Sequence, residues 1–165
     1  MFSAHDERGS FLKPWTLEAS PVNFDVDEVF CSISGRGVIR GMHVQSGPVQ
    51  GWRLVFVTHG RARDFAVDLR GGSPSYGHVV EALLEPGGSA VLIPPGCGHG
   101  FESLEDGTTM VYLQQGRHDP RFDTGVHWQS CGLELDCDEP IVSERDEQLA
   151  DLRDFDTPFS WDQSV

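Results

Sequence analysis

The sequence predicts a single all-β domain, built as a sandwich or barrel of short strands and followed by one short helix. Nineteen glycines and ten prolines among 165 residues favour a fold with frequent turns. Between residues 37 and 135, β-like runs alternate with turn signals at intervals of about eight to twelve residues, the spacing of a sandwich or barrel. No repeat or linker divides the chain, so we expect one domain over residues 1–165.

The expected strands follow an N-terminal arm of extended strand and loop over residues 1–29. A run at 53–58 is followed by the turn His59-Gly60 and a second run at 62–69, which we predict to be its hairpin partner. The remaining strands are expected at residues 78–84, 89–93, 100–104 and 109–114.

The only strong helix signal comes near the end of the chain, where residues 143–165 are expected to form a helix and a tail. Ser143 is a good N-cap, and Asp146 follows three residues later. Leu149 and Leu152 would form an apolar stripe. The acidic and aromatic tail is expected either to pack on the barrel or to lie across a neighbouring subunit.

The charge balance narrows the classes of partner. Twenty-six acidic residues against twelve basic ones give a formal net charge of −14. Such a surface repels phosphate backbones and anionic headgroups, so we expect neither nucleic acid nor a membrane as a partner. No apolar run approaches the ~20 residues needed to span a bilayer. If the ligand is anionic, the few arginines must gather where it binds.

The four cysteines, at positions 31, 97, 131 and 137, are widely spaced and form no CxxC motif. Residues 1–8 are polar and contain no apolar stretch of the kind found in a secretory signal. We therefore expect free thiols and a cytoplasmic location.

Two histidines lie in motifs with a recognisable spacing. Gly37 precedes His43 with five residues between them, and His99 follows a Pro-x-Gly-x-x sequence that begins at Pro94. This is the skeleton of the two cupin motifs, so we predict a cupin-type jelly roll. Metal cupins continue the first motif as His-x-His and then a glutamate, whereas Gln45 stands here and no glutamate follows in the motif. Two histidines alone fall short of a metal site, so we expect no metal and no other cofactor.

Each candidate residue also has an ordinary structural explanation. His43 could be an ordinary histidine that faces a pocket. His99 could simply cap a loop. Tyr112, in the run Met-Val-Tyr-Leu, would more often be a core residue than a catalytic one. Asp146 could be no more than the acid of a capping box. None of the four is decisive alone.

Taken together, the motifs over residues 6–146 resemble the dTDP-4-dehydrorhamnose 3,5-epimerase family. The string formed by Asp68-Leu-Arg70, Gly72-Ser-Pro and Tyr76-Gly77 is specific to that family and not general to cupins. The other matching stretches are Asp6-Glu-Arg8-Gly9-Ser-Phe11, Ser32-Ile-Ser34, Gly37-Val-Ile-Arg40-Gly-Met-His43, Asp64-Phe-Ala-Val, Ile93-Pro-Pro-Gly-Cys-Gly-His99-Gly-Phe101, Tyr112 and Ser143-Glu-Arg-Asp146.

The resemblance implies epimerisation of a nucleotide-linked 4-keto-6-deoxy sugar at C3, C5 or both, by removal and return of a proton next to the ketone. His43 matches the family's base and Asp146 its carboxylate partner. Tyr112 matches the acid on the opposite face. Arg53 takes the place of the family's lysine near the developing enolate.

The resemblance also implies a set of binding residues and a homodimer, in which the N-terminal strand of one subunit contributes to the neighbour's site. Arginines would hold the pyrophosphate of the substrate, and Phe11 would stack on its nucleobase. The expected substrate-binding residues are Arg8, Phe11, Arg40, Gln45, His99, Arg117 and Arg145.

Several positions depart from the family pattern. Phe30 replaces an asparagine, Lys13 a glutamate, and Arg117 and His118 a pair of tyrosines. We expect these changes, with Arg53, to alter the sugar, the nucleotide or the number of epimerised carbons while the proton transfer is retained.

Two other classes of function stay open. A metal-dependent cupin oxygenase or isomerase is disfavoured by Gln45. A catalytically silent sugar-nucleotide binding module is disfavoured because binding alone does not require His43, Asp146 and Tyr112 together.

Overall fold

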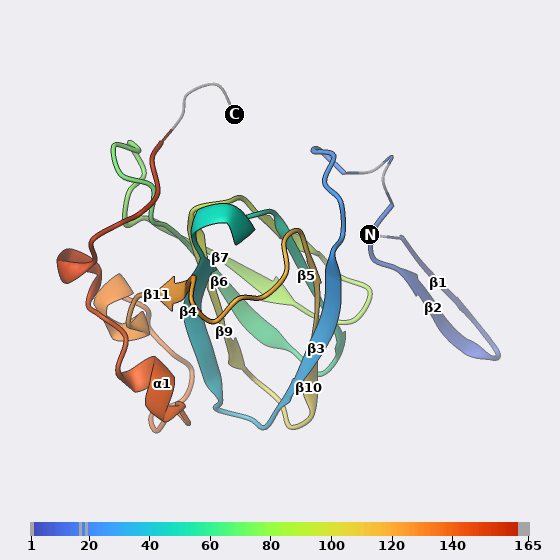
Figure 1. Cartoon of the computed structure of the whole chain (residues 1–165). Helices are drawn as coiled ribbons and strands as arrows, with labels where there is room; N and C mark the ends of the chain where they lie inside the picture. The colour runs from blue at the N-terminus through green and yellow to red at the C-terminus, as the bar shows by residue number, and fades with distance from the viewer. Residues whose placement is uncertain (1, 17, 19, 162–165) are drawn as a thin grey trace.

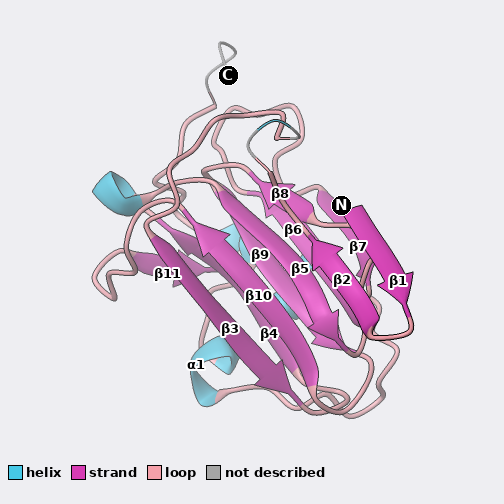
Figure 2. Ribbon diagram, turned by 90° about the vertical axis from the view of Figure 1, so that its right-hand side faces the viewer, coloured by secondary structure: helices cyan, strands magenta, loops and turns pink. Residues whose placement is uncertain are grey.

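Two antiparallel sheets face each other in a computed structural model that describes residues 2–16, 18 and 20–161. Their strands run along a common general direction (Figure 2). One sheet has the order β3 (Glu28–Ser34), β10 (Thr108–Gln114), β5 (Arg53–His59) and β8 (Val91–Ile93). The other has the order β11 (Asp123–Gly125), β4 (Ile39–Gln45), β9 (Cys97–Ser103), β6 (Ala62–Asp68) and β7 (Val79–Leu84). The predicted all-β, cupin-type jelly roll is confirmed.

The remaining elements are short. A separate hairpin consists of β1 (Phe2–Asp6) and β2 (Gly9–Lys13). The 3-10 turns of the described chain include η2 (Gly47–Val49), η3 (Trp128–Cys131) and η4 (Leu152–Asp154), and the one α-helix in the described ranges is α1 (Glu144–Glu147). No helix of the described chain is long and apolar enough to cross a membrane.

The prediction that 53–58 and 62–69 form a hairpin is wrong. β5 pairs with β10 and β8, whereas β6 pairs with β9 and β7. The short turn after His59 carries the chain from one sheet to the other, because a jelly roll connects strands that are consecutive in sequence across its two layers.

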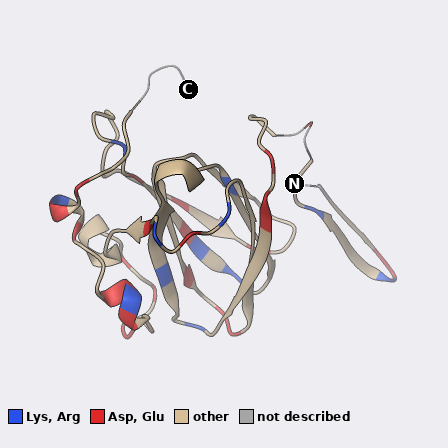
Figure 3. Cartoon of the chain, viewed as in Figure 1, with Lys and Arg blue, Asp and Glu red and all other residues tan. Residues whose placement is uncertain are grey.

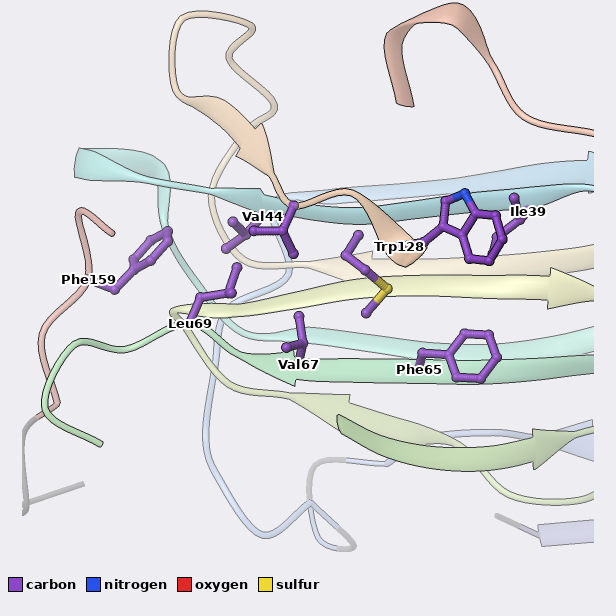
Figure 4. Close-up of a cluster of buried hydrophobic side chains, with 9 residues drawn as sticks. Ile39, Val44, Phe65, Val67, Leu69, Trp128 and Phe159 are labelled. Atoms are coloured by element: carbon purple, nitrogen blue, oxygen red, sulfur yellow. The ribbon is translucent and has the colours of Figure 1, made fainter. Parts of the chain in front are cut away.

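Two apolar cores hold the layers together. The first fills the space between the sheets and includes Val55, Phe101 and Met110, all at most 1% exposed. The second lies on the outer face of the five-stranded sheet, where the C-terminal segment covers β4 and β6 (Figure 4). There Trp128 and Phe159 pack with Phe65 and its neighbours.

The C-terminal segment packs on the barrel, which was one of the two arrangements expected for the tail. The Gly71 amide donates to the Phe159 carbonyl at 2.9 Å. The predicted helical stripe of Leu149 and Leu152 is wrong, because α1 ends at Glu147 and Leu152 begins the separate turn η4. Leu152 packs against the core on the outer face of the five-stranded sheet, so it serves packing instead of a regular helix.

The N-terminal arm is a hairpin that lies on the opposite side of the barrel from α1 (Figure 1). Its side chains from Ser3 to Phe11 are exposed. Strands β3 and β11 were not predicted. β3 was missed because it carries exposed apolar residues, Val29 and Ile33, with no alternation that indicates a buried face.

Candidate active site

A cavity of about 810 Å³ opens between the two sheets. Its lining includes Asp146, Arg145 and Ser143 from the segment around α1, which closes one side. The predicted site residues that line it are Arg40, His43, Arg53, His99, Tyr112, Arg145 and Asp146.

An irregularity in β4 brings Arg40 and His43 to the same cavity. Residues three apart on a regular strand point to opposite faces, but the pairing of β4 with β9 shifts register between these two residues. Gly41 lies within the shift with φ +120°, and a Cβ there would come within 2.5 Å of the Gly100 backbone. Only glycine fits this conformation and this close approach.

His43 and Asp146 form a hydrogen-bonded pair. Nε2 of His43 lies 2.7 Å from Oδ1 of Asp146, and their side chains are 25% and 4% exposed. Oδ2 accepts from the Gly41 amide at 3.1 Å, and the Asp146 amide donates to Ser143 Oγ at 3.2 Å. Burial by itself would raise the pKa of Asp146, but the hydrogen bonds from His43 and Gly41 together lower it. The carboxylate is therefore ionised and accepts a hydrogen bond from the Nε2–H group, which leaves Nδ1 as the basic nitrogen.

Tyr112, on β10, is held on several sides. Its ring stacks on Phe30 at 4.6 Å with an interplanar angle of 11°, and the ring of His99 meets it edge-on at 5.9 Å. The phenol oxygen lies 3.4 Å from Ser32 Oγ. Burial raises the pKa of Tyr112, although the Ser32 hydrogen bond and nearby Arg53 oppose the change. The phenol is thus protonated at neutral pH and able to donate.

Arg53 reaches the cavity from β5. Its Nε and Nη2 donate to Oε1 of Gln114 at 3.1 and 2.8 Å. Burial lowers the pKa of Arg53, while Tyr112 and Asp123 act in the opposite direction. Guanidinium still keeps its charge at physiological pH.

His99 is fixed by a second buried carboxylate. Its Nε2 lies 2.6 Å from Oδ1 of Asp64, and both side chains are at most 3% exposed. The neighbouring strands β9 and β6 supply the two residues. His99 thereby forms a rigid wall beside Tyr112.

The remaining cationic side chains of the cavity differ in their pairing. Arg40 donates from Nε to the neutral Ser34 Oγ at 3.1 Å, whereas Arg145 forms an ion pair with Asp123 at 2.6 Å. Figure 3 shows basic and acidic residues both on the strands and on α1. Of the eleven arginines, three line the cavity, namely Arg40, Arg53 and Arg145.

Four predicted binding residues do not line the cavity of this chain. Arg8 and Phe11 lie on the exposed N-terminal hairpin, where Arg8 pairs with Asp6. Gln45 is buried beside the cavity, and its Oε1 accepts from the Asp119 amide at 2.9 Å. Arg117 is exposed on the loop after β10. In the single chain the side chain of Gln45 faces the loop of Asp119 and Arg117 faces solvent, so their role in substrate binding stays a prediction.

Sequence reasoning missed several residues of the site. Gln114 follows Tyr112 by two positions on an alternating strand, which was a usable signal for a shared face. Asp64 belongs to a stretch that matches the family, but no role was predicted for it. Asp123 and Ser32 acquire their places only through β11 and β3.

The described residues contain no cluster of three His, Cys, Asp or Glu side chains with the geometry of a metal site. His43 and His99 each use one ring nitrogen on a carboxylate.

Comparison with known proteins places the chain in a family. The family model described as dTDP-4-dehydrorhamnose 3,5-epimerase matches residues 2–154. The chain belongs to this family. A dTDP-4-dehydrorhamnose 3-epimerase from Streptomyces niveus is 38% identical over 159 residues, which cover 90% of this chain and 77% of the relative.

Two solved structures of the family share the fold. A dTDP-4-dehydrorhamnose 3,5-epimerase from Sulfolobus tokodaii aligns with a TM-score of 0.83 and 32% identity, covering 92% of this chain and 87% of its own. A 3'-monoepimerase from Streptomyces bikiniensis, crystallised with dTDP-quinovose, aligns with a TM-score of 0.85 and 29% identity, covering 92% and 81%. The family therefore includes enzymes named for one epimerised carbon and for two.

Proposed function

We propose that this chain is an epimerase of a nucleotide-linked 4-keto-6-deoxy sugar, acting at C3, C5 or both. The observation that carries the proposal is the shared cavity, which holds a carboxylate-backed imidazole and a protonated phenol in a member of an epimerase family. Inversion at carbon needs a base and an acid on opposite faces.

In the proposed reaction, Nδ1 of His43 takes the proton from the carbon beside the C4 ketone, and the electron pair moves onto the C4 oxygen. Arg53 stabilises this enolate by its positive charge. Tyr112 returns a proton to the opposite face as the enolate collapses to the ketone. The His43 imidazolium and the Tyr112 phenolate are then reset by proton exchange with water, so the cycle consumes no cofactor.

The substrate's diphosphate would meet the cationic side chains at the cavity. Arg40 is exposed and, among the described residues, its guanidinium is bonded only to a neutral hydroxyl, which leaves its remaining N–H groups for a phosphate oxygen. Arg145 would give up part of its ion pair with Asp123 in order to bind the diphosphate of the substrate. Gln45, His99 and Arg117 remain expected substrate-binding residues, of which only His99 lines the cavity of the single chain.

We also propose a homodimer in which the N-terminal hairpin reaches the neighbour's site. Arg8 and Phe11 are exposed and lie away from the cavity of their own chain, so they would serve a second copy. The exposed apolar side chains of β3, Val29 and Ile33, offer a surface for that copy. Four free cysteines fit a cytoplasmic location.

The deciding experiment incubates the protein with dTDP-4-keto-6-deoxyglucose in deuterated water and follows the sugar by NMR. We expect deuterium at C3, C5 or both, with inverted configuration. GDP- and CDP-linked 4-keto sugars run in parallel identify the nucleotide. The absence of exchange with all three would favour a silent binding module, and stoichiometric metal in active protein would favour a metal-dependent cupin.

A further inference from the structure

We infer that Gln114 is the positioning residue of Arg53, and that it aims the guanidinium into the cavity without neutralising its charge. The inference rests on the proposed function, in which Arg53 faces the enolate. It concerns a residue for which neither the motifs nor the resemblance supplied a role.

The geometry of the two side chains is specific. Arg53 and Gln114 are direct cross-strand partners of β5 and β10, and both line the cavity. Nε and Nη2 of Arg53 converge on the same Oε1 atom. The amide nitrogen of Gln114 donates to the Gly116 carbonyl at 3.3 Å, which fixes which end of the amide faces Arg53. Nη1 has no hydrogen-bond partner among the described residues.

The chemistry of the acceptor matters as much as its place. Several arginines of this chain, including Arg63, Arg70 and Arg145, pair with carboxylates. Arg53 is held by a neutral amide and forms no ion pair in the described part of the chain, although Asp123 acts on it electrostatically from farther away. An amide orients the guanidinium, whereas a carboxylate in the same place would cancel the field that the enolate requires.

This pairing also gives a physical reason for arginine at a position where the family resemblance leads one to expect lysine. Two nitrogens of the planar fork are used for orientation, and the third remains for the substrate. The ammonium group of a lysine has a single nitrogen, so it cannot divide orientation and substrate contact between separate atoms. We therefore expect Arg53→Lys to lower kcat even though it keeps the charge.

The kinetic test compares Gln114→Met, which removes the acceptor, with Gln114→Glu, which keeps the shape and adds charge. Gln115→Met and Gln115→Glu are matched controls, because Gln115 bonds the Trp52 amide and does not line the cavity. We expect kcat to fall about 10–100-fold in Gln114→Met and about 10²–10³-fold in Gln114→Glu, with KM within about threefold.

A double variant decides whether the effect passes through Arg53. Gln114→Met should cost little further rate when added to Arg53→Met, because the group it positions is already gone. Equal losses from Gln114→Met in both backgrounds, or losses equal to those of the Gln115 controls, would overturn the inference.

A titration without substrate tests the same coupling. Tyr76 and Tyr112 are the only tyrosines, so in a Tyr76→Phe background phenolate absorbance reports Tyr112 alone. Arg53 favours the phenolate of Tyr112 electrostatically. We expect Gln114→Glu to move the titration of Tyr112 to higher pH, and Gln115→Glu to move it less. Equal shifts in the two variants, or no shift in either, would refute the inference. This titration needs no substrate, so it can be read even if the wild type exchanges no proton with any sugar. A failure to exchange would contradict only the proposed function.

Discussion

Nε2 of His43 lies 2.7 Å from Oδ1 of Asp146, although the two residues are 103 positions apart in the chain. A carboxylate in this place fixes the tautomer of the His43 ring. The Gly41 amide donates to the second carboxylate oxygen, and Ser143 Oγ accepts from the backbone amide of Asp146 and so fixes the backbone of that residue. The pair therefore depends on α1 being anchored against β4.

Asp146→Asn should lower kcat by about 10²–10⁴-fold, because an amide no longer fixes the tautomer that leaves Nδ1 free. The matched control is Glu147→Gln, an isosteric change on the same helix at an exposed position. The rate of deuterium incorporation from deuterated water measures the effect. A rate within threefold of the wild type would remove Asp146 from its proposed role.

Tyr112→Phe should separate proton removal from inversion. His43 would still abstract a proton and return a deuteron to the same face, so we expect slow deuterium incorporation with retained configuration and loss of the epimer. NMR of the recovered sugar distinguishes the two outcomes. Tyr76→Phe is the control at the other tyrosine. Inversion at a normal rate in Tyr112→Phe would assign the acid to another group.

Mixing two inactive variants should restore activity if the hairpin acts on the partner subunit. A dimer of one Arg8→Ala chain and one His43→Asn chain would contain one site with both residues intact. After random re-association we expect recovery to roughly a quarter of the wild-type rate. Each variant alone supplies the control. No recovery in a proven mixed dimer would place the hairpin on its own subunit.

Asp68→Asn should destabilise the fold at neutral pH. The Asp68 carboxylate accepts from the Arg70 backbone and guanidinium and from the hydroxyls of Ser73 and Ser75. Burial alone would raise the pKa of Asp68, but these bonds together hold it well below the ordinary value. Losing a charged acceptor of this kind costs on the order of 1–3 kcal/mol.

The pH dependence follows from the direction of that shift. A carboxylate whose pKa is lower in the folded state stabilises the fold at pH values above its unfolded-state pKa of about 3.9. This contribution is lost as the pH falls toward and through the folded-state pKa. The difference in free energy of unfolding between wild type and Asp68→Asn should be constant above about pH 5 and shrink below about pH 4. Denaturant titrations check this, with Asp138→Asn as an exposed control. A difference that grows in acid would contradict it.

Local patterns predicted much of the fold and part of the site. Alternation over 109–114 predicted a strand, which β10 confirms, and the cap at Ser143 is present. The error at 53–69 shows the limit: a short turn between two β-like runs looks the same in sequence whether the strands pair or separate into two sheets. Asp123 entered the site through the pairing of β11 with β4, which single-strand periodicity does not reveal.

By itself, the sequence determined that this protein is built from short strands, that its net charge is strongly negative, and that it carries an imidazole, a carboxylate and a phenol in family motifs. Only the tertiary structure decided that these groups share one cavity and that Arg53 is held by a neutral amide. Strand formation is a local matter of side-chain alternation and turn residues. Contacts between distant strands depend instead on register, on the shift at Gly41 and on how the C-terminal segment packs, and these follow from the energy of the whole fold.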